Sequence, residues 1–337
     1  MIFFFIVDSR KQSGLGHLKR SFLLVKELEK LGHKNYIFCN KIFFNQEVNN
    51  KSSFVVFRKK KLKDNMLLIK KKIELVSPDF IIFDTYEINQ GIIDTIKKTN
   101  KKIMVIHDYK FFRKNINIYL NYNCNSNSNS NSNINTDLLL GSKFTLVKKT
   151  NKHPRHYNKE IKNILLFFGG SDSNNLNLNF LKLFKDKTFE KYKFNFILGP
   201  NIKNRKIIED NFKLTRFNKK SFNRNFQKNL YECDLYMGTG GSSMWDVLIT
   251  RTPGIFFPIN KNQKKNCSQL NQKKKIVVEN VKNLNKSEYM KKKLINYFNN
   301  YKSIKNIAKL NLNLVDGLGP KRIVNCIINY DRAKIKN

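Results

Sequence analysis

Short apolar runs alternate along the chain with lysine-rich segments of helical spacing, and this alternation restricts the fold more than any other feature. Residues 2–7 (IFFFIV) contain no polar side chain, which is typical of a strand covered on both faces of a sheet. From His17 onward apolar residues recur at helical spacing, and Gly32 follows as a C-cap would. Further apolar runs stand at residues 36–40, 54–57, 80–86 and 102–109. The pattern predicts a doubly wound α/β unit with a parallel sheet.

The same pattern restarts in the second half of the chain. A strand meets a glycine turn at residues 162–172, and later strands are expected at 193–199, 214–217, 233–241 and 253–259. We therefore expect Rossmann-like domains at 1–155 and 156–318, and a C-terminal helix within 319–337 that can pack back on the first domain. Ligands of such sheets bind beyond the carboxyl ends of the strands. The predicted fold class is two Rossmann-like domains whose parallel sheets face an interdomain cleft.

Two segments are expected to lie outside this packed framework. Residues 121–135 (NYNCNSNSNSNSNIN) are polar and of low complexity, so they are predicted to form a mobile loop. Residues 153–156 (HPRH) place two histidines near a proline with no carboxylate partner. This spacing favours a solvated linker over a metal site, and no metal site is predicted.

The net charge of +40 would ordinarily suggest a nucleic-acid partner. The lysines are, however, spread over the whole chain, and there is no zinc-finger spacing, aromatic RNA-binding motif or basic arm. We therefore expect no nucleic-acid partner, while the surface should attract small anions such as nucleotides. A noncatalytic protein that binds nucleotides or polyanions remains an alternative, and steep salt dependence of DNA binding would favour it.

Cysteine usage and hydropathy predict a cytoplasmic protein. The five cysteines include no C-x-x-C pair, which indicates reduced thiols. The apolar start of the chain is short, lacks a positive leader and runs into charged residues, so a strand is expected there and not a signal peptide. No stretch is long enough to insert stably in a membrane. A monomer is expected.

Three glycine-rich turns follow predicted strands, at residues 14–17 (GLGH), 169–172 (GGSD) and 238–243 (GTGGSS). Glycines let the backbone approach a ligand, and amides that open the next helix can bind phosphate. Neither the dinucleotide fingerprint nor the P-loop pattern is complete. The GGSD turn could equally be a matter of chain geometry.

The third turn carries the strongest nucleotide signal. Gly240, Gly241 and Ser242 open a predicted helix, and Asp246 lies about one turn in, where its carboxylate could accept hydrogen bonds from ribose hydroxyls. The alternative is an acid that only complements the helix dipole. Asn262 and Gln263 follow a strand end and offer amides that both donate and accept, which suits the hydroxyl or acetamido groups of a sugar.

Six blocks of the sequence, taken together, resemble one enzyme family. The blocks are DSRKQSGLGHLKRS, FDTYEI, ILLFFGGSD, YECDLYMGTGGSSMWDVL, FFPINKNQ and VDGLGPKR, in order from about residue 3 to about residue 325. They are similar to the UDP-2,4-diacetamido-2,4,6-trideoxy-β-L-altropyranose hydrolases, which resemble MurG-type glycosyltransferases in their GT-B fold. The resemblance implies metal- and cofactor-independent cleavage between the anomeric carbon and phosphate, in the synthesis of pseudaminic acid, a nonulosonic acid attached to flagellins.

The resemblance also implies roles for individual residues. His17 matches the catalytic histidine of the family, and Tyr86 matches the tyrosine of its aspartate-x-tyrosine element near the sugar. Gly240, Gly241, Ser242 and Asp246 match the UDP-binding turn, and Asn262 with Gln263 match the amide pair near the sugar. The expected substrate contacts also include Gly14, Gly16, Arg20 and Gly170.

The chain departs from the family at three positions. Asp246 stands where glutamate is usual, His107 replaces one of two acids, and Lys148 stands where arginine is usual. Lysine cannot make the paired, bidentate hydrogen bonds that an arginine guanidinium makes with a phosphate or carboxylate. These changes affect the expected binding of the nucleotide and the expected identity of the sugar more than the expected class of reaction.

The residues themselves suit hydrolysis by inversion. UDP is a good leaving group that needs stabilisation of charge, which backbone amides at a glycine turn can supply. The attacking water needs a base, and a histidine can accept its proton near neutral pH. We therefore hypothesise that His17 activates water, while a helix-start histidine that only fills a turn or contacts phosphate is the alternative. The rival enzyme class is a glycosyltransferase that uses a UDP-sugar donor.

Overall fold

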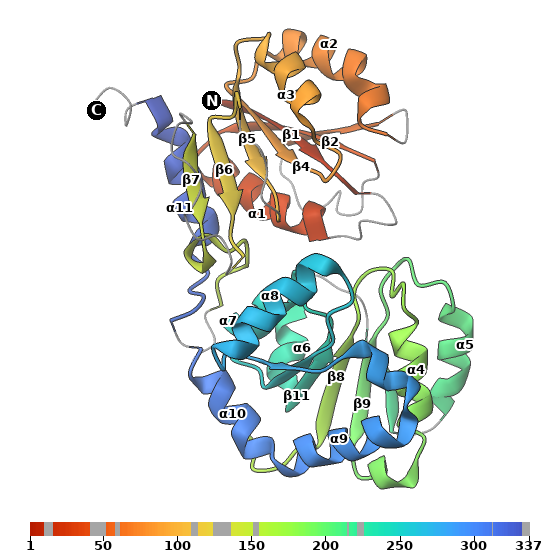
Figure 1. Cartoon of the computed structure of the whole chain (residues 1–337). Helices are drawn as coiled ribbons and strands as arrows, with labels where there is room; N and C mark the ends of the chain where they lie inside the picture. Colours follow the sequence, from red (N-terminus) through yellow and green to blue (C-terminus); the bar gives the residue numbers. More distant parts are fainter. Residues whose placement is uncertain are drawn as a thin grey trace. The chain divides into compact units, whose positions relative to one another are not determined.

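The computed structural model describes residues 1–9, 16–40, 52–57, 61–108, 114–123, 136–150, 155–213, 216–220, 226–311 and 313–331. The chain divides into two compact units (Figure 1). Unit 1 comprises Met1–Val147 and Gly317–Asn337, and unit 2 comprises Lys148–Asp316. Each unit is an α/β structure with its own sheet and its own apolar core.

Unit 1 is built on a seven-stranded sheet of order β3-β2-β1-β4-β5-β6-β7, in which every neighbouring pair is parallel. Its strands are β1 (Ile2–Val7), β2 (Lys34–Cys39), β3 (Ser52–Val56), β4 (Phe80–Asp84), β5 (Lys102–Ile106), β6 (Ile118–Asn121) and β7 (Asp137–Leu140). Residues 3–7 of β1 are completely buried. The continuous apolar run therefore does mark a strand that is covered on both faces.

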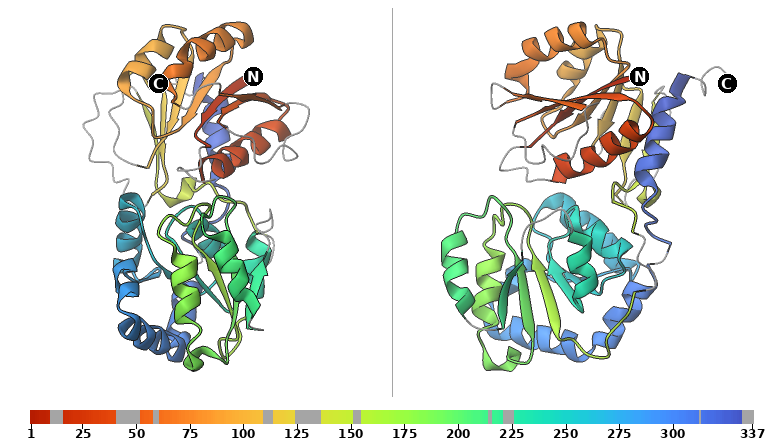
Figure 2. Two further views of the ribbon diagram at one scale, coloured as in Figure 1. Left: turned by 90° about the vertical axis from the view of Figure 1, so that its right-hand side faces the viewer. Right: turned by 180° about the vertical axis from the view of Figure 1, so that it is seen from behind.

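Helices cover both faces of this sheet. They are α1 (Gly16–Lys30), α2 (Met66–Val76), α3 (Gln90–Lys97) and α11 (Gly319–Ile328), with the short 3-10 helices η2 (Lys63–Asn65) and η3 (Ser142–Phe144). The apolar stripes of α2 and α3 pack on Phe4, Ile6 and Phe83 from one side of the sheet. On the other side α1 packs beside α11 (Figure 2). Gly32, at φ 83°, ends the α1 segment as predicted.

The C-terminal helix belongs to unit 1 through specific contacts. The Tyr330 ring meets Phe80 edge to face at 5.8 Å, and Asn117 Nδ2 donates a hydrogen bond to Tyr330 Oη over 3.1 Å. At the other end of α11, Gly319 lies so close to the backbone carbonyl of Thr145 that a Cβ atom would come within 2.2 Å of its oxygen. A segment distant in sequence thus completes the core of the first unit.

Unit 2 is built on a six-stranded parallel sheet of order β10-β9-β8-β11-β12-β13. Its strands are β8 (Asn163–Phe167), β9 (Lys193–Ile197), β10 (Phe217–Lys220), β11 (Leu235–Gly238), β12 (Gly254–Phe256) and β13 (Val277–Val278). Its helices are α4 (Leu176–Leu183), α5 (Arg205–Asp210), α6 (Phe226–Glu232), α7 (Ser243–Ile249), α8 (Lys261–Gln272), α9 (Ser287–Asn299) and α10 (Tyr301–Lys309), with η4 (Lys187–Phe189), η5 (Asn211–Lys213) and η6 (Val281–Asn285). Stacked phenylalanines fill the core, among them Phe184 and Phe194 with ring centroids 4.0 Å apart.

The strand order places one topological switch point in each sheet. In unit 1 the chain runs outward from β1 through β2 to β3 and then restarts on the opposite side of β1 with β4. In unit 2 it does the same around β8 and β11. Connections leave such neighbouring strands in opposite directions, which opens a crevice beyond their carboxyl ends where ligands of these folds bind. Gly170 follows β8 and Gly240 follows β11 at the switch point of unit 2, and Gly16 begins α1 after β1 at that of unit 1.

The structure confirms two parallel α/β sheets and corrects two details of the sequence reading. Residues 121–123 are not part of a mobile loop, because Asn121 ends β6 and Tyr122 is buried; residues 124–135 lie outside the described ones. Arg155 is not a solvated linker residue either. It is buried, and its Nη1 atom donates hydrogen bonds to the Leu230 carbonyl over 2.7 Å and to Thr252 Oγ1 over 3.0 Å. Capping the end of α6 in this way compensates for burial of the charge.

Two glycine-to-alanine variants test the packing of α11. We expect Gly319→Ala to destabilise the protein by about 1–3 kcal/mol, because the new methyl group meets rigid backbone. Gly91→Ala is the matched control, since a Cβ there would have its nearest neighbour at 3.5 Å. That change should be neutral or stabilising by up to about 1 kcal/mol, owing to the better helix propensity of alanine. Urea unfolding of both variants measures the difference, and equal midpoints would contradict the close contact.

Candidate active site

His17 stands at the first turn of α1, the helix that follows β1 at the switch point of unit 1. The side chain is 5% exposed. Gly16 is the first residue of the helix, whereas the predicted contact Gly14 and the neighbouring Arg10 lie outside the described residues. Within the described residues, His17 is thus placed by the first turn of α1.

Asp84, the last residue of β4, orients the imidazole of His17. The Nδ1 atom of His17 lies 2.5 Å from Asp84 Oδ1. An ionised carboxylate can only accept hydrogen bonds, so Nδ1 carries the proton and donates it to Asp84. Nε2 is then the nitrogen that can accept a proton from a substrate or water, as in other aspartate–histidine pairs.

Asp84 is fully buried, and its charge is balanced by a surrounding set of donors. Arg20 Nε donates to Oδ1 and Oδ2 over 2.9 and 2.8 Å, and Ser21 Oγ donates to Oδ2 over 3.0 Å. Burial alone would raise the pKa of Asp84, but the charge of Arg20 and the hydrogen bonds from Arg20 and His17 hold it below its usual range. Asp84 therefore remains an acceptor.

Arg20 joins this carboxylate to a second one. Its Nη1 atom donates to Asp108 Oδ1 over 3.0 Å and to Tyr122 Oη over 3.1 Å. Burial would raise the pKa of Asp108, yet the charge of Arg20, with smaller contributions from the hydrogen bonds of Tyr86 and Arg20, lowers it to about 2. Arg20 is only 5% exposed. Its guanidinium donates to Asp84, Asp108 and Tyr122, so it holds these side chains together in one cluster.

Tyr86 completes the cluster on the exposed side. Its ring meets His17 edge to face, with centroids 4.6 Å apart and an interplanar angle of 88°, and it also meets the ring of His107 with centroids 5.6 Å apart. The Tyr86 hydroxyl donates a hydrogen bond to Asp108. Burial and the charge of Asp108 raise the pKa of Tyr86, so the phenol stays neutral. The residue is nevertheless 40% exposed, which leaves part of its ring accessible.

The structure brings His17, Arg20 and Tyr86 together, and the residue that connects them, Asp84, was not assigned a role from the sequence. Asp84 lies in the FDTYEI block and closes an otherwise apolar strand. A carboxylate at the end of such a buried strand indicates a functional or structural pairing, because its burial is tolerated only when a specific partner compensates for its charge. Tyr122 gave no such signal, since it lies in a run of asparagines and tyrosines.

In unit 2 the GTGGSS turn is packed so closely that glycine is required. A Cβ atom on Gly240 would lie 2.1 Å from Cys267 Sγ, and one on Gly238 would lie 2.3 Å from the carbonyl oxygen of Phe167. Gly241 is less crowded, with Gln263 Nε2 as the nearest atom at 3.4 Å. Gln263, in the first turn of α8, therefore lies beside the turn that opens α7.

The remaining predicted residues of unit 2 lie in or next to α7 and α8. Ser242 immediately precedes α7, and Asp246 is buried within it, with Gln227 Nε2 3.3 Å from Asp246 Oδ1. The same Gln227 amide donates to the backbone carbonyl of Lys148 over 2.8 Å. Asn262 Oδ1 accepts from the backbone N–H of Gln263 over 2.8 Å. Asp246 thus contacts α6, and Asn262 contacts Gln263, whose amide lies beside the turn that follows β11.

The GGSD turn has a clear structural role in the described chain. A Cβ atom on Gly199 would lie 2.5 Å from the Gly170 carbonyl oxygen, and that oxygen accepts from Asn201 N over 2.9 Å. Asp172 accepts from the backbone N–H groups of Leu176 and Asn177 over 2.8 and 2.9 Å, so its side chain caps the start of α4. The geometric reading of this turn has direct support, and a substrate contact at Gly170 stays a prediction.

The described residues contain neither a metal-binding cluster nor a helix suited to cross a membrane. No group of three or more histidine, cysteine, aspartate or glutamate side chains in the described ranges is arranged to hold a metal ion. Likewise, none of the helices in the described part of the chain has the length and apolar character that crossing a membrane requires.

Comparison with known sequences gives two distant relatives, and no family model matches the chain. Over 280 residues it is 28% identical to the uncharacterized protein MJ1062 of Methanocaldococcus jannaschii, covering 77% of this chain and 56% of that protein. Over 262 residues it is 25% identical to a Helicobacter pylori protein named pseudaminic acid cytidylyltransferase and UDP-2,4-diacetamido-2,4,6-trideoxy-β-L-altropyranose hydrolase, covering 77% and 44%. The chain spans about half the length of the curated relatives it matches.

Solved structures share the fold over nearly the whole chain. MurG of Acinetobacter baumannii matches with a TM-score of 0.68 at 10% identity, covering 97% of this chain and 99% of that one. The spinosyn rhamnosyltransferase SpnG complexed with thymidine diphosphate matches with a TM-score of 0.67 at 11% identity, covering 98% and 100%. These similarities confirm the predicted fold class, two parallel-sheet α/β domains of the GT-B glycosyltransferase kind.

The depressed pKa of Asp108 makes a prediction about acid stability. Its ordinary pKa is near 3.8 and its folded pKa is about 2, so ionisation of Asp108 stabilises the fold above pH 4 and this contribution is lost as the pH falls from about 4 to about 2. At pH 7 the contribution is about 2 kcal/mol. Asp108→Asn should be less stable than wild type by roughly that amount, and the difference should shrink below pH 4.

Urea unfolding of the whole chain between pH 7 and pH 2.5, with hydrogen exchange at amides of unit 1, measures this difference. A gap between wild type and Asp108→Asn that stays constant over the whole pH range would show that the ion pair with Arg20 does not stabilise unit 1.

Proposed function

We propose that the protein hydrolyses a UDP-linked 2,4-diacetamido-2,4,6-trideoxyhexose to UDP and the free sugar, with inversion at the anomeric carbon. The observation that carries the proposal is the His17–Asp84 pair at the switch point of unit 1. The relative from Helicobacter pylori whose name includes such a hydrolase supports the substrate class. A structural neighbour that binds thymidine diphosphate supports a nucleotide-sugar ligand.

In this mechanism His17 acts as the general base. Nε2 takes a proton from water as the water oxygen attacks C1, and the bond between C1 and the phosphate oxygen breaks with its electron pair leaving on UDP. Asp84, which holds the Nδ1 proton, stabilises the imidazolium that forms. The proton then passes from Nε2 to solvent, which restores the neutral base.

The other members of the unit 1 cluster position this base. Arg20 satisfies Asp84 and Asp108 together, so we assign it a positioning role and not the direct substrate contact expected from the sequence. Tyr86 restricts the imidazole ring from its edge and offers an exposed face toward the sugar. Gly14 and Gly16 are proposed to let the backbone approach the ligand beside His17.

Unit 2 is proposed to hold the nucleotide. Backbone amides at Gly240, Gly241 and Ser242 would stabilise the charge that develops on the leaving diphosphate. Asp246 would accept from ribose hydroxyls, and the Asn262–Gln263 pair and Gly170 would contact the rest of the ligand. Because UDP leaves as a stable anion, no second carboxylic acid is needed to protonate it, unlike in glycosidases, and neither a metal nor a cofactor is invoked.

The proposed reaction would supply a diacetamido sugar for pseudaminic acid synthesis in the cytoplasm. A second candidate is a glycosyltransferase, favoured by the glycosyltransferases among the structural neighbours. The two functions share a donor and differ in whether water or another hydroxyl attacks C1.

Product analysis without an acceptor separates these candidates. The purified protein is incubated with the UDP-linked diacetamido sugar alone, and UDP, the free sugar and its anomeric configuration are followed by NMR. Hydrolysis predicts equal amounts of UDP and sugar, with inverted configuration in the first product formed. Release that requires an added acceptor would identify a transferase and contradict the proposal.

Variants of the dyad test the mechanism. His17→Asn should lower kcat by about 10²- to 10⁴-fold, the range general base catalysis supplies, with the affinity for UDP unchanged. Asp84→Asn should also lower kcat by about a hundredfold or more with little change in KM, because the amide no longer enforces the Nδ1–H tautomer. Ser21→Ala is the matched control, since it removes one hydrogen bond to Asp84 and leaves the imidazole contact. A folded His17→Asn protein that turns over at the wild-type rate would remove His17 from the mechanism.

A further inference from the structure

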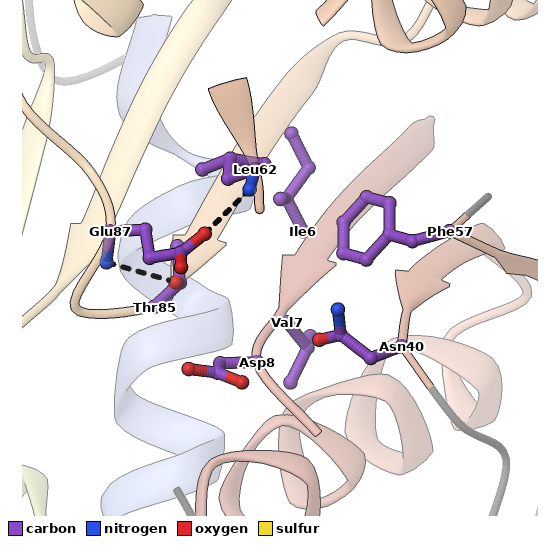
Figure 3. Close-up of a pocket in the computed structure, with 8 residues that line it drawn as sticks. All are labelled: Ile6, Val7, Asp8, Asn40, Phe57, Leu62, Thr85 and Glu87. Carbon is purple, nitrogen blue, oxygen red and sulfur yellow. Dashed lines mark hydrogen bonds between the residues drawn. The ribbon is translucent and has the colours of Figure 1, made fainter. Parts of the chain in front are cut away.

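At the switch point of unit 1 a small pocket opens at the carboxyl ends of β1 and β4 (Figure 3). It lies on the face of the sheet that α2 and α3 cover, and its lining is mixed, with Ile6 among the apolar residues and Asp8 and Thr85 among the polar ones. The pocket has room for about one water molecule, so no part of a sugar fits into it.

Unit 2 places a tyrosine at the corresponding strand ends. Tyr236 belongs to β11, and its fully buried ring meets Phe226 of α6 with centroids 6.2 Å apart. Its neighbours in the strand, Leu235 and Met237, belong to the core on the opposite face. The helices α6 and α7 stand before and after β11 in the chain as α2 and α3 stand before and after β4, so the two places correspond in topology.

The hydroxyl of Tyr236 joins the ends of β8 and β11. It donates a hydrogen bond over 3.1 Å to the carbonyl oxygen of Phe167, the last residue of β8. A Cβ atom on Gly238, the last residue of β11, would lie 2.1 Å from the same hydroxyl oxygen, so the hydroxyl occupies the space that a side chain at this position would need. Burial raises the pKa of Tyr236, so the hydroxyl keeps its proton for the hydrogen bond.

The same hydroxyl also reaches the start of α7. Its oxygen lies 3.3 Å from Oγ of Ser243, the first residue of this helix. The single proton of the phenol goes to the carbonyl of Phe167, because a carbonyl can only accept, so Ser243 donates to Tyr236. Gly238 and Ser243 stand directly before and after the turn at residues 239–242. One buried hydroxyl thus contacts this turn at both of its ends.

This turn carries the backbone amides that are proposed to bind the diphosphate, those of Gly240, Gly241 and Ser242. Amides stabilise an anion best when they are held in place before it binds, because ordering them at the moment of binding costs free energy. Two adjacent glycines have more conformational freedom to lose than other residues. The contacts of Tyr236 restrict this freedom and leave the amides of the turn available to a ligand.

We propose that Tyr236 is a positioning residue of the nucleotide site, which holds the turn at residues 239–242 in the conformation that binds the diphosphate. The proposal rests on the proposed function, because that function assigns the diphosphate to this turn. Tyr236 is buried and acts on the ligand only through Gly238 and Ser243.

Binding of UDP and of uridine to the whole chain tests this role. Tyr236→Phe removes only the hydroxyl and should weaken UDP binding by about 3- to 20-fold, the effect of one or two hydrogen bonds. The affinity for uridine, which lacks the diphosphate, should change by less than about twofold. Isothermal titration calorimetry measures UDP binding, and NMR titration measures the weaker binding of uridine.

Tyr301→Phe is the matched control. The Tyr301 hydroxyl is also buried and donates to a backbone carbonyl, that of Asp234 over 2.9 Å, but Asp234 precedes β11 at its amino end. This variant should lower the unfolding temperature about as much as Tyr236→Phe, and it should leave the ratio of UDP affinity to uridine affinity at the wild-type value.

Ser243→Ala tests the other hydroxyl of the link, and it serves alone if Tyr236→Phe does not fold. It should lower the ratio of UDP affinity to uridine affinity to a similar extent, and the double variant should lose little more than either single variant, because the two hydroxyls act as one unit.

A ratio of UDP affinity to uridine affinity in Tyr236→Phe equal to those of wild type and Tyr301→Phe would overturn the proposal. Losses that add fully in the double variant would overturn it as well. A wild-type protein that does not bind UDP contradicts the proposed function instead, so the two failures are distinguishable.

Discussion

The candidate site of unit 1 depends on the burial of one negative charge, that of Asp84 at the end of β4. A carboxylate without water is very unfavourable unless partners compensate for it. Arg20, Ser21 and His17 all direct donors to it, and Arg20 in turn requires a second carboxylate, Asp108. The imidazole is consequently held in one tautomer by the same interactions that make the buried charge tolerable.

Both units use their sheets in the same way. At each switch point the connections from two neighbouring central strands run in opposite directions, which leaves a crevice beyond the carboxyl ends of these strands. In unit 1 this edge carries a titratable cluster and a small mixed pocket. In unit 2 it carries the glycine turn at residues 238–241, where Phe167 and Cys267 leave no room for a side chain at Gly238 and Gly240. One edge thus carries a buried histidine–carboxylate cluster, and the other carries backbone without side chains at two glycines.

The sequence predicted elements whose signal is local. The apolar run of β1, the helical stripe of α1 and the opening of α7 after the GTGG turn are all found where the residues indicated them. The sequence did not predict features that depend on contacts between residues distant along the chain. The four-residue strands β6 and β7 flank a segment rich in asparagine and serine, and their short apolar runs were not recognised as strands beside it. Arg155 reads as a linker residue, yet it is buried because carbonyls of Leu230 and Cys233 meet its guanidinium.

The sequence by itself determined the class of fold, two parallel sheets with glycine turns after their strands, because hydrophobic periodicity and turn residues act over a few positions. It also singled out His17 and Tyr86 as candidates for chemistry. Only the tertiary structure decided how they are connected. Arg20 contacts Asp84, Asp108 and Tyr122 across 64, 88 and 102 residues of sequence. Such pairings arise when parallel strands bring their ends to one edge, so no local pattern along the chain records them.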